Sequence, residues 1–174
     1  MRSCFHAVAA LLVATAWGSG APQSSEAQNP KLRKDASGIE ACALLTVEEI
    51  EAAAGWKPEA ADPDKHGTTA TCNYHGADEA KVKSIVLVIS PGLRVLESSA
   101  AMAKWRSESV ARHPELKIVV EPVERLDVPA ISSRSEDDPV PTLEASAKGV
   151  LVAVRSPSLE VSKVLAAKAI ARLR

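Results

Sequence analysis

The chain has 174 residues and a formal net charge of −1, from 21 Lys and Arg against 22 Asp and Glu. Charges of both signs are mixed along it, so the concentrated basic surface on which nucleic-acid binding depends is missing. Aromatic residues make up only 3% of the chain, too few for the stacking platforms that hold single strands, and we therefore expect no nucleic-acid partner.

Residues 1–27 have the pattern of a secretory signal peptide. Arg2 and His6 precede an apolar stretch at residues 7–17, and small and polar residues follow it. The apolar stretch is too short to span a bilayer, which takes about 20 residues. Cys4 lies before this stretch, whereas the lipid-carrying cysteine of a bacterial lipoprotein follows it. We predict cleavage near residues 20–27 and an exported protein, periplasmic or extracellular, that is soluble rather than lipid-anchored and has no membrane span.

Removal of the signal peptide leaves two cysteines, Cys42 and Cys72. In an oxidising compartment an even number of cysteines predicts a disulfide. A pair of free buried thiols is the alternative, and a zinc site is disfavoured because Cys42 has no His or acidic ligand at the usual spacing. In the chain-entropy model, closing a loop of about 30 residues stabilises a fold by on the order of 3.5 kcal/mol.

The first half of the mature chain predicts a helix followed by a β-hairpin. After a solvated leader at residues 28–38, Thr46 and Glu49 form a capping box that starts a helix over residues 47–54, and Gly55 ends it. Beyond this helix we expect a turn-rich loop at residues 62–67 and a hairpin of strands at residues 68–75 and 81–89.

A long helix is predicted over residues 93–112. Its apolar positions at helical spacing form one face, made of Leu93, Leu96, Ala100, Ala103, Ser107 and Val110. Trp105 lies off that face, on its flank. Two roles are open for this ring, packing along the edge of the helix or anchoring a binding partner, because exposed aromatic residues are favoured anchors at interfaces.

The next part of the chain predicts three more strands. The first covers residues 116–123, and a polar, irregular loop at residues 124–141 follows it. Strands at residues 142–147 and 150–155 then form a hairpin, with Lys148-Gly149 as its turn.

A last helix closes the chain. It begins at Ser156-Pro157, with proline in the first turn, and its apolar stripe extends to residue 173. Hairpins combined with helices of this kind predict an α+β fold, an antiparallel sheet with helices packed on one face and one disulfide. The length fits a single domain at residues 39–174.

The pattern Cys-x-Leu-Leu-Thr-x-x-Glu, a short helix ended by Gly, and Cys-x-Tyr resembles a family of uncharacterised bacterial envelope proteins. They are largely actinobacterial lipoproteins that share a domain of unknown function, and the extracellular sensor domains of some mycobacterial receptor kinases look distantly similar. The matching positions are Cys42, Leu44, Leu45, Thr46, Glu49, Gly55, Cys72 and Tyr74. The likeness spans residues 39–174 and implies an envelope location and this architecture. The chain lacks the lipid-attachment cysteine of this family and the glycine-rich stretch that often precedes the last hairpin. The resemblance therefore implies neither a membrane tether nor a role for the loop before that hairpin.

No motif for catalysis is present, and we nominate no catalytic residue, metal ligand or cofactor site. Asp62, Asp64 and His66 lie close together in sequence, yet a hard-cation loop supplies more oxygens than these three residues offer. His75 and His113 belong to no nucleophile or metalloprotease motif.

These observations predict a non-enzymatic, exported module of the cell envelope that binds a partner protein or a small ligand. Its candidate surfaces are Trp105 and the loop at residues 124–141, which is long for a connection in a compact domain. A purely structural envelope protein and, less strongly, an exported hydrolase whose residues assemble only in three dimensions are the alternatives. The sequence does not define the partner, the ligand or the oligomeric state.

Overall fold

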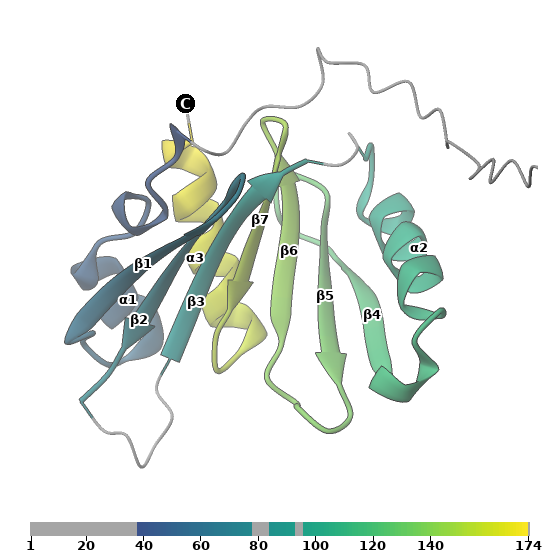
Figure 1. Ribbon diagram of the computed structural model, residues 1–174, viewed down its shortest axis with the longest axis horizontal. Helices are drawn as coiled ribbons and strands as arrows, with labels where there is room; N and C mark the ends of the chain where they lie inside the picture. Colours follow the sequence, from purple (N-terminus) through teal and green to yellow (C-terminus); the bar gives the residue numbers. More distant parts are fainter. Residues whose placement is uncertain (1–37, 78–83, 93–95, 174) are drawn as a thin grey trace, which may run out of the picture.

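The computed structural model describes residues 38–77, 84–92 and 96–173. The predicted signal peptide and all but the last residue of the predicted leader lie outside these ranges. The described part forms one seven-stranded antiparallel sheet, in the order β1-β2-β3-β7-β6-β5-β4, with three α-helices packed on it (Figure 1). The α+β class predicted from the sequence is confirmed. No helix within these ranges is long and apolar enough to cross a membrane.

Both hairpins predicted from the sequence are confirmed, β2 with β3 and β6 with β7. Lys148 and Gly149 connect β6 to β7 with φ of 51° and 81°, the pair of left-handed residues that a type I′ turn requires. The strands are β1 (Ala60–His66), β2 (Thr69–His75), β3 (Ser84–Pro91), β4 (Ile118–Val123), β5 (Ala130–Ser135), β6 (Thr142–Ala147) and β7 (Val150–Arg155).

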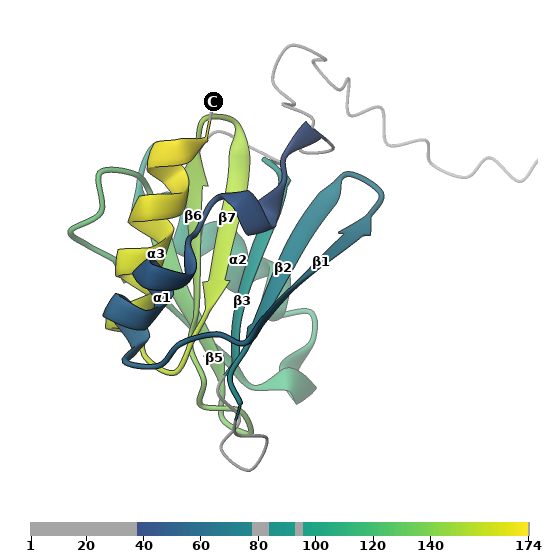
Figure 2. The same ribbon diagram turned by 90° about the vertical axis from the view of Figure 1, so that its left-hand side faces the viewer.

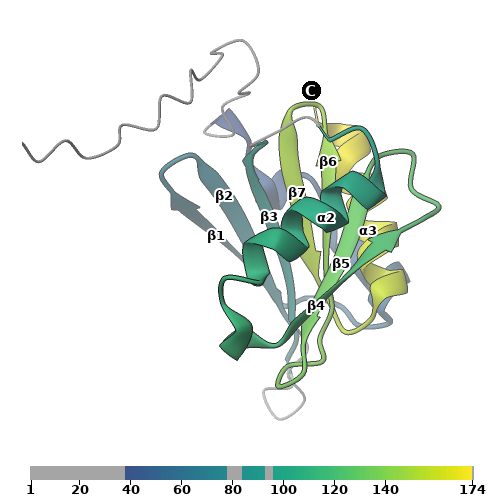
Figure 3. The same ribbon diagram turned by 90° about the vertical axis from the view of Figure 1, so that its right-hand side faces the viewer.

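The helices cover both faces of the sheet, whereas the sequence placed them on one. α1 (Val47–Ala54) and α3 (Leu159–Arg172) lie on one face, and α2 (Ser99–Val110) lies on the other (Figures 2 and 3). Successive side chains of β7 point to opposite faces of the sheet. Val152 belongs to the main core under α1 and α3, whereas Leu151 packs against the small cluster under α2.

α2 is shorter than the helix predicted over residues 93–112, and it is turned differently. Its buried residues are Met102 and Ala103, whereas Ala100 and Ser107, which the sequence placed on the buried face, are exposed. The predicted face is confirmed at Ala103 and is wrong at Ala100 and Ser107, because the helix carries too few large apolar side chains for periodicity alone to define its buried face.

Two strands lie where the sequence predicted loops. β1 replaces the loop predicted at residues 62–67; it is exposed along its whole length and contains Pro63, which an edge strand tolerates. β5 lies inside the loop predicted at residues 124–141, so that prediction is wrong. Ser132 and Ser133 of β5 are buried, and these polar side chains hid the strand from a search for apolar alternation.

The predicted disulfide between Cys42 and Cys72 is confirmed, with Cα atoms 5.1 Å apart. Cys42 lies in the short 3₁₀ helix η2 (Ala41–Ala43), and Cys72 is buried in the middle of β2. Tyr74 points to the same side of β2 as Cys72, and its hydroxyl donates a hydrogen bond to the Cys42 carbonyl at 3.5 Å. The segment before α1 is therefore attached to the sheet both covalently and by a buried tyrosine.

Replacing Cys42 and Cys72 together by Ala should reduce the free energy of unfolding by about 3 kcal/mol, because the unfolded chain regains the freedom of the closed loop. The melting temperature, measured by circular dichroism without reductant, should fall by roughly 10 °C. Reductant should lower the melting temperature of the wild type by a similar amount and leave the double variant unchanged. A reductant effect of equal size in both proteins would contradict a stabilising role for this bond.

Candidate functional site

The surfaces nominated from the sequence do not come together in one place. Trp105 is half-buried on α2, so the ring belongs neither to the core nor to the fully exposed surface. β5 divides the predicted loop at residues 124–141 into two short connections, residues 124–129 and 136–141. A single long binding loop is therefore absent from this region, and the role of Trp105 stays a prediction.

The three histidines in the described part of the chain lie apart, and each contacts a single carboxylate. His66 Nε2 lies 3.2 Å from Asp64 Oδ2, and His75 Nε2 lies 3.5 Å from Asp62 Oδ2. His113 contacts the neighbouring Glu115 near the exposed end of α2. Within the described ranges, no group of three His, Cys, Asp or Glu side chains is arranged to hold a metal ion.

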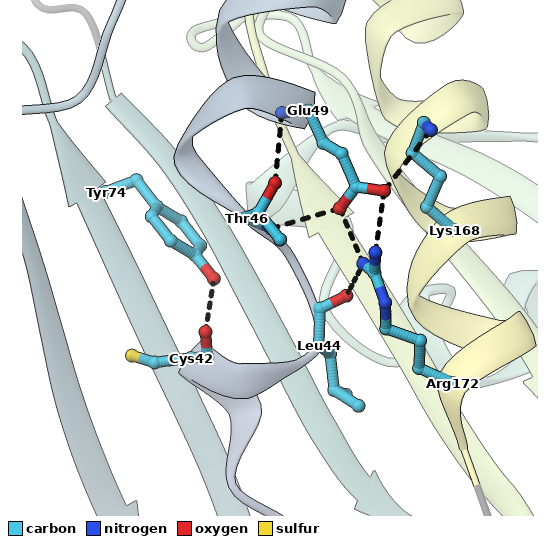
Figure 4. A network of polar contacts seen from close by, with 7 residues as sticks. All are labelled: Cys42, Leu44, Thr46, Glu49, Tyr74, Lys168 and Arg172. Carbon is cyan, nitrogen blue, oxygen red and sulfur yellow. Dashed lines mark hydrogen bonds and ion pairs between the residues drawn. The ribbon is translucent and has the colours of Figure 1, made fainter.

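Glu49 lies at the centre of a polar network that joins α1 to the end of α3 (Figure 4). Its carboxylate accepts a hydrogen bond from the Thr46 amide at 3.0 Å, and the Thr46 hydroxyl accepts one from the Glu49 amide at 3.3 Å, which confirms the predicted capping box. Both terminal nitrogens of Arg172 contact the carboxylate, at 2.5 and 2.8 Å, and Lys168 Nζ lies 3.3 Å from it. Arg172 also donates to the Leu44 carbonyl at 2.8 Å.

The electrostatics of this network suit a structural contact. The hydrogen bonds from Arg172 lower the pKa of Glu49 from 4.5 to about 2. Burial, with the charge of Glu49 as a second cause, raises the pKa of Tyr74 to about 12. A general acid or base works best with a pKa near the operating pH, and both of these groups lie far from it.

A buried ion pair that was not predicted from the sequence joins α2 to the sheet. Arg106 Nη2 lies 3.1 Å from Glu144 Oε1, and the Glu144 side chain is only 6% exposed. Burial raises the pKa of Glu144, while the charge of Arg106 and the Ser133 hydroxyl act in the opposite direction. The available signal was the alternation of β6, which places Glu144 on the face opposite to Leu143 and therefore under a helix that had been assigned to the other side.

The sheet face under α2 is covered over only part of its width. α2 packs on β4 and β5, at one end of the sheet, so within the described ranges β1, β2 and β3 have no helix over them on this side (Figure 1). We call this uncovered area the open face. It consists of the side chains of Asp62, Asp64, Thr71, Asn73, Val86, Val88, Ala153 and Arg155.

The open face changes character from its middle to its edge. Val88 lies in register between Ala153 of β7 and Thr71 of β2, and all three side chains are half-buried. The next residues outward in register are the exposed Asp64 and Asp62 of β1. An aliphatic centre is thus followed by a polar row and then by an acidic edge.

Replacing Glu49 by Gln should remove an acid-sensitive part of the stability. Because the folded-state pKa of Glu49 is depressed, its charged form stabilises the fold fully above pH 4.5, and this contribution is lost as the pH falls to about 2. Wild type should lose on the order of 2–3 kcal/mol more than Glu49→Gln across this range in urea titrations. Gln still completes a capping box, so the comparison isolates the charge.

The matched control is Glu51→Gln, which changes an exposed carboxylate on the same helix. Its stability should follow the wild-type pH profile. If Glu49→Gln also followed the wild-type profile down to pH 2, the Arg172 contact would not stabilise the fold.

Replacing Arg106 alone by Leu should destabilise the protein by about 3 kcal/mol at neutral pH, because the Glu144 carboxylate is left buried without its partner. The raised pKa of Glu144 means that the cost falls as the pH is lowered and the carboxyl takes up a proton. The double variant Arg106→Leu/Glu144→Leu should recover most of the loss, measured by urea unfolding at neutral and mildly acidic pH. Equal stability of the single variant and the wild type at both pH values would contradict this account.

Comparison with known proteins gives no relative from which a function can be carried over. No protein-family model, curated protein or solved structure matches the chain. The likeness of residues 39–174 to bacterial envelope proteins stays a prediction from the sequence. The function is therefore inferred from the disulfide, the ion pairs and the open face.

Proposed function

We propose that the protein is an exported, non-enzymatic module of the bacterial envelope that binds a partner protein through the open face. Export is supported by the Cys42–Cys72 disulfide, since such bonds form and persist in oxidising compartments. It is also supported by the signal-peptide pattern of residues 1–27, which lie outside the described part.

The observation that carries the proposal is the aliphatic centre of the open face. One face of an antiparallel sheet can be solvated, and it then carries polar side chains. Here Val86 and Val88 of β3 and Ala153 of β7 occupy neighbouring positions on a face that no described helix covers. All three side chains are half-buried, so part of their apolar surface is accessible, and an accessible apolar patch with a polar rim is typical of a protein interaction site.

The acidic edge indicates the chemistry of the partner. Among the described residues, Asp62 and Asp64 form ion pairs only with the exposed His75 and His66, and Asp64 also accepts a hydrogen bond from the Lys65 amide. Arg155, at the other side of the open face, is bound to Asp138. A partner surface with aliphatic residues at its centre and Lys or Arg at one edge is complementary to this arrangement, and opposite charges at an interface edge speed association.

The proposal gives the open face no catalytic step. In the described part of the chain, His66 and His75 lie at the exposed edge beside this face, each next to one carboxylate. Ser84 of β3 lies opposite His75 in register, and the described residues show no side-chain hydrogen bond between the two. A nucleophile–base pair needs both groups within hydrogen-bond reach. Binding is thus the activity that these side chains support.

A photo-crosslinker placed at residue 88 should capture the partner in intact envelopes, and the purified partner should bind the wild-type chain. Val88→Arg should weaken that binding by more than about tenfold, because a charge is then buried at the centre of the interface. The matched control is Val164→Arg, a change of the same kind at an exposed valine of α3 on the other side of the molecule. Trp105→Ala tests whether the half-buried ring on α2 contributes to the same interface.

Loss of binding in Val88→Arg with retention in Val164→Arg is the expected result. Asp62→Lys/Asp64→Lys should slow association and reduce its dependence on salt. Equal binding by Val88→Arg and the wild type would overturn the proposal, as would crosslinking at residue 88 to no protein. The latter result would favour a purely structural role.

A further inference from the structure

A hollow of about 330 Å³ lies on the sheet face opposite to the open face, between the end of β4 and the first turn of α3. This volume is at the lower end of the range of small-molecule sites, which starts at about 300 Å³. The hollow lies beside the main core, because Val123 at the end of β4 is a buried member of that core. It is separate from every residue of the open face.

The floor of the hollow combines apolar and polar groups. Val123 is buried and Leu159 is half-buried, so both present apolar surface. Ser132 of β5 is only 8% exposed and lines the hollow, so it adds a polar group to the floor.

The rim carries charges of both signs. Glu121 lies in β4, and Glu124 and Arg125 directly follow the end of that strand. Lys163 belongs to α3. In the described part of the chain neither glutamate forms an ion pair, and neither does Arg125, although all line one hollow. Only Lys163 has a partner, Glu160 at 2.8 Å.

The connection at residues 124–129, which carries Glu124 and Arg125, is held in place at both ends. The Ser99 hydroxyl of α2 donates a hydrogen bond to the Val123 carbonyl and accepts one from the Ala130 amide, each at 3.0 Å. Arg125 between them adopts a φ of 67°, a conformation that costs a residue other than glycine about 1 kcal/mol or more and that persists where the surroundings enforce it. The rim is thus ordered before any molecule binds.

We propose that this hollow binds a small zwitterion, an α-amino acid or a peptide end with an aliphatic side chain. The ligand carboxylate contacts Arg125, whose planar guanidinium suits bidentate binding of a carboxylate. The ligand ammonium lies between Glu121 and Glu124, and the aliphatic side chain packs on Leu159. This site is independent of the proposed partner, because the two surfaces lie on opposite faces of the sheet.

The test is a titration of the full mature chain with leucine, followed by amide chemical shifts in NMR spectra. Shifts should move at Glu121, Glu124, Arg125 and Ser132 and stay unchanged on β1, β2 and β3. Leucinamide, which has no carboxylate, and N-acetyl-leucine, which has no ammonium, should each bind at least about tenfold more weakly. Equal binding of all three compounds would overturn the assignment of the two charges, and absence of shifts at millimolar leucine would overturn the site.

Substitutions on the rim give a second measurement. Arg125→Gln and Glu121→Gln should each weaken leucine binding by about tenfold without lowering the melting temperature, because both side chains are exposed. The matched control is Arg134→Gln, an exposed arginine of β5 that does not line the hollow. If the control weakened binding as much as Arg125→Gln, the effect would come from overall charge and the proposed contact would be wrong.

Discussion

The carboxylate of Glu49 acts on two helices at once, and the packing of α1 against α3 depends on it. It completes the cap of α1 through the Thr46 amide, and it binds Arg172 and Lys168 in the last turns of α3. α1 is only eight residues long, too short to be stable alone in water. Its place on the sheet therefore depends on this contact, on the buried Ile50 and on the disulfide that holds the preceding segment.

Elements with strong local signals were predictable from the sequence. The capping box at Thr46 and the Lys148-Gly149 turn follow from short-range chemistry, and the disulfide follows from the even number of cysteines left after removal of the signal peptide. The structure contains all three features. β1 and β5 were missed because most of their residues are charged, proline or serine. Whether such a segment forms a strand depends on its pairing with neighbouring strands, and local propensity does not include that pairing.

The candidate sites were harder to predict than the fold, and the reason is again tertiary. The Arg106–Glu144 pair joins residues 38 positions apart, and neither residue stands out in its own segment. The open face exists because α2 covers one end of the sheet and α3 covers the other face. The two surfaces to which we assign binding are thus the parts of each face that the helices leave uncovered.

Both edge strands contain a proline, Pro63 in β1 and Pro122 in β4. A proline has no amide hydrogen and interrupts the row of donors along which a further strand would add. Edge-to-edge pairing of the sheet with another copy or with a foreign strand is therefore interrupted in the middle of β1 and near the end of β4. The same property protects the fold from linear aggregation and directs any molecule that binds the sheet to its faces.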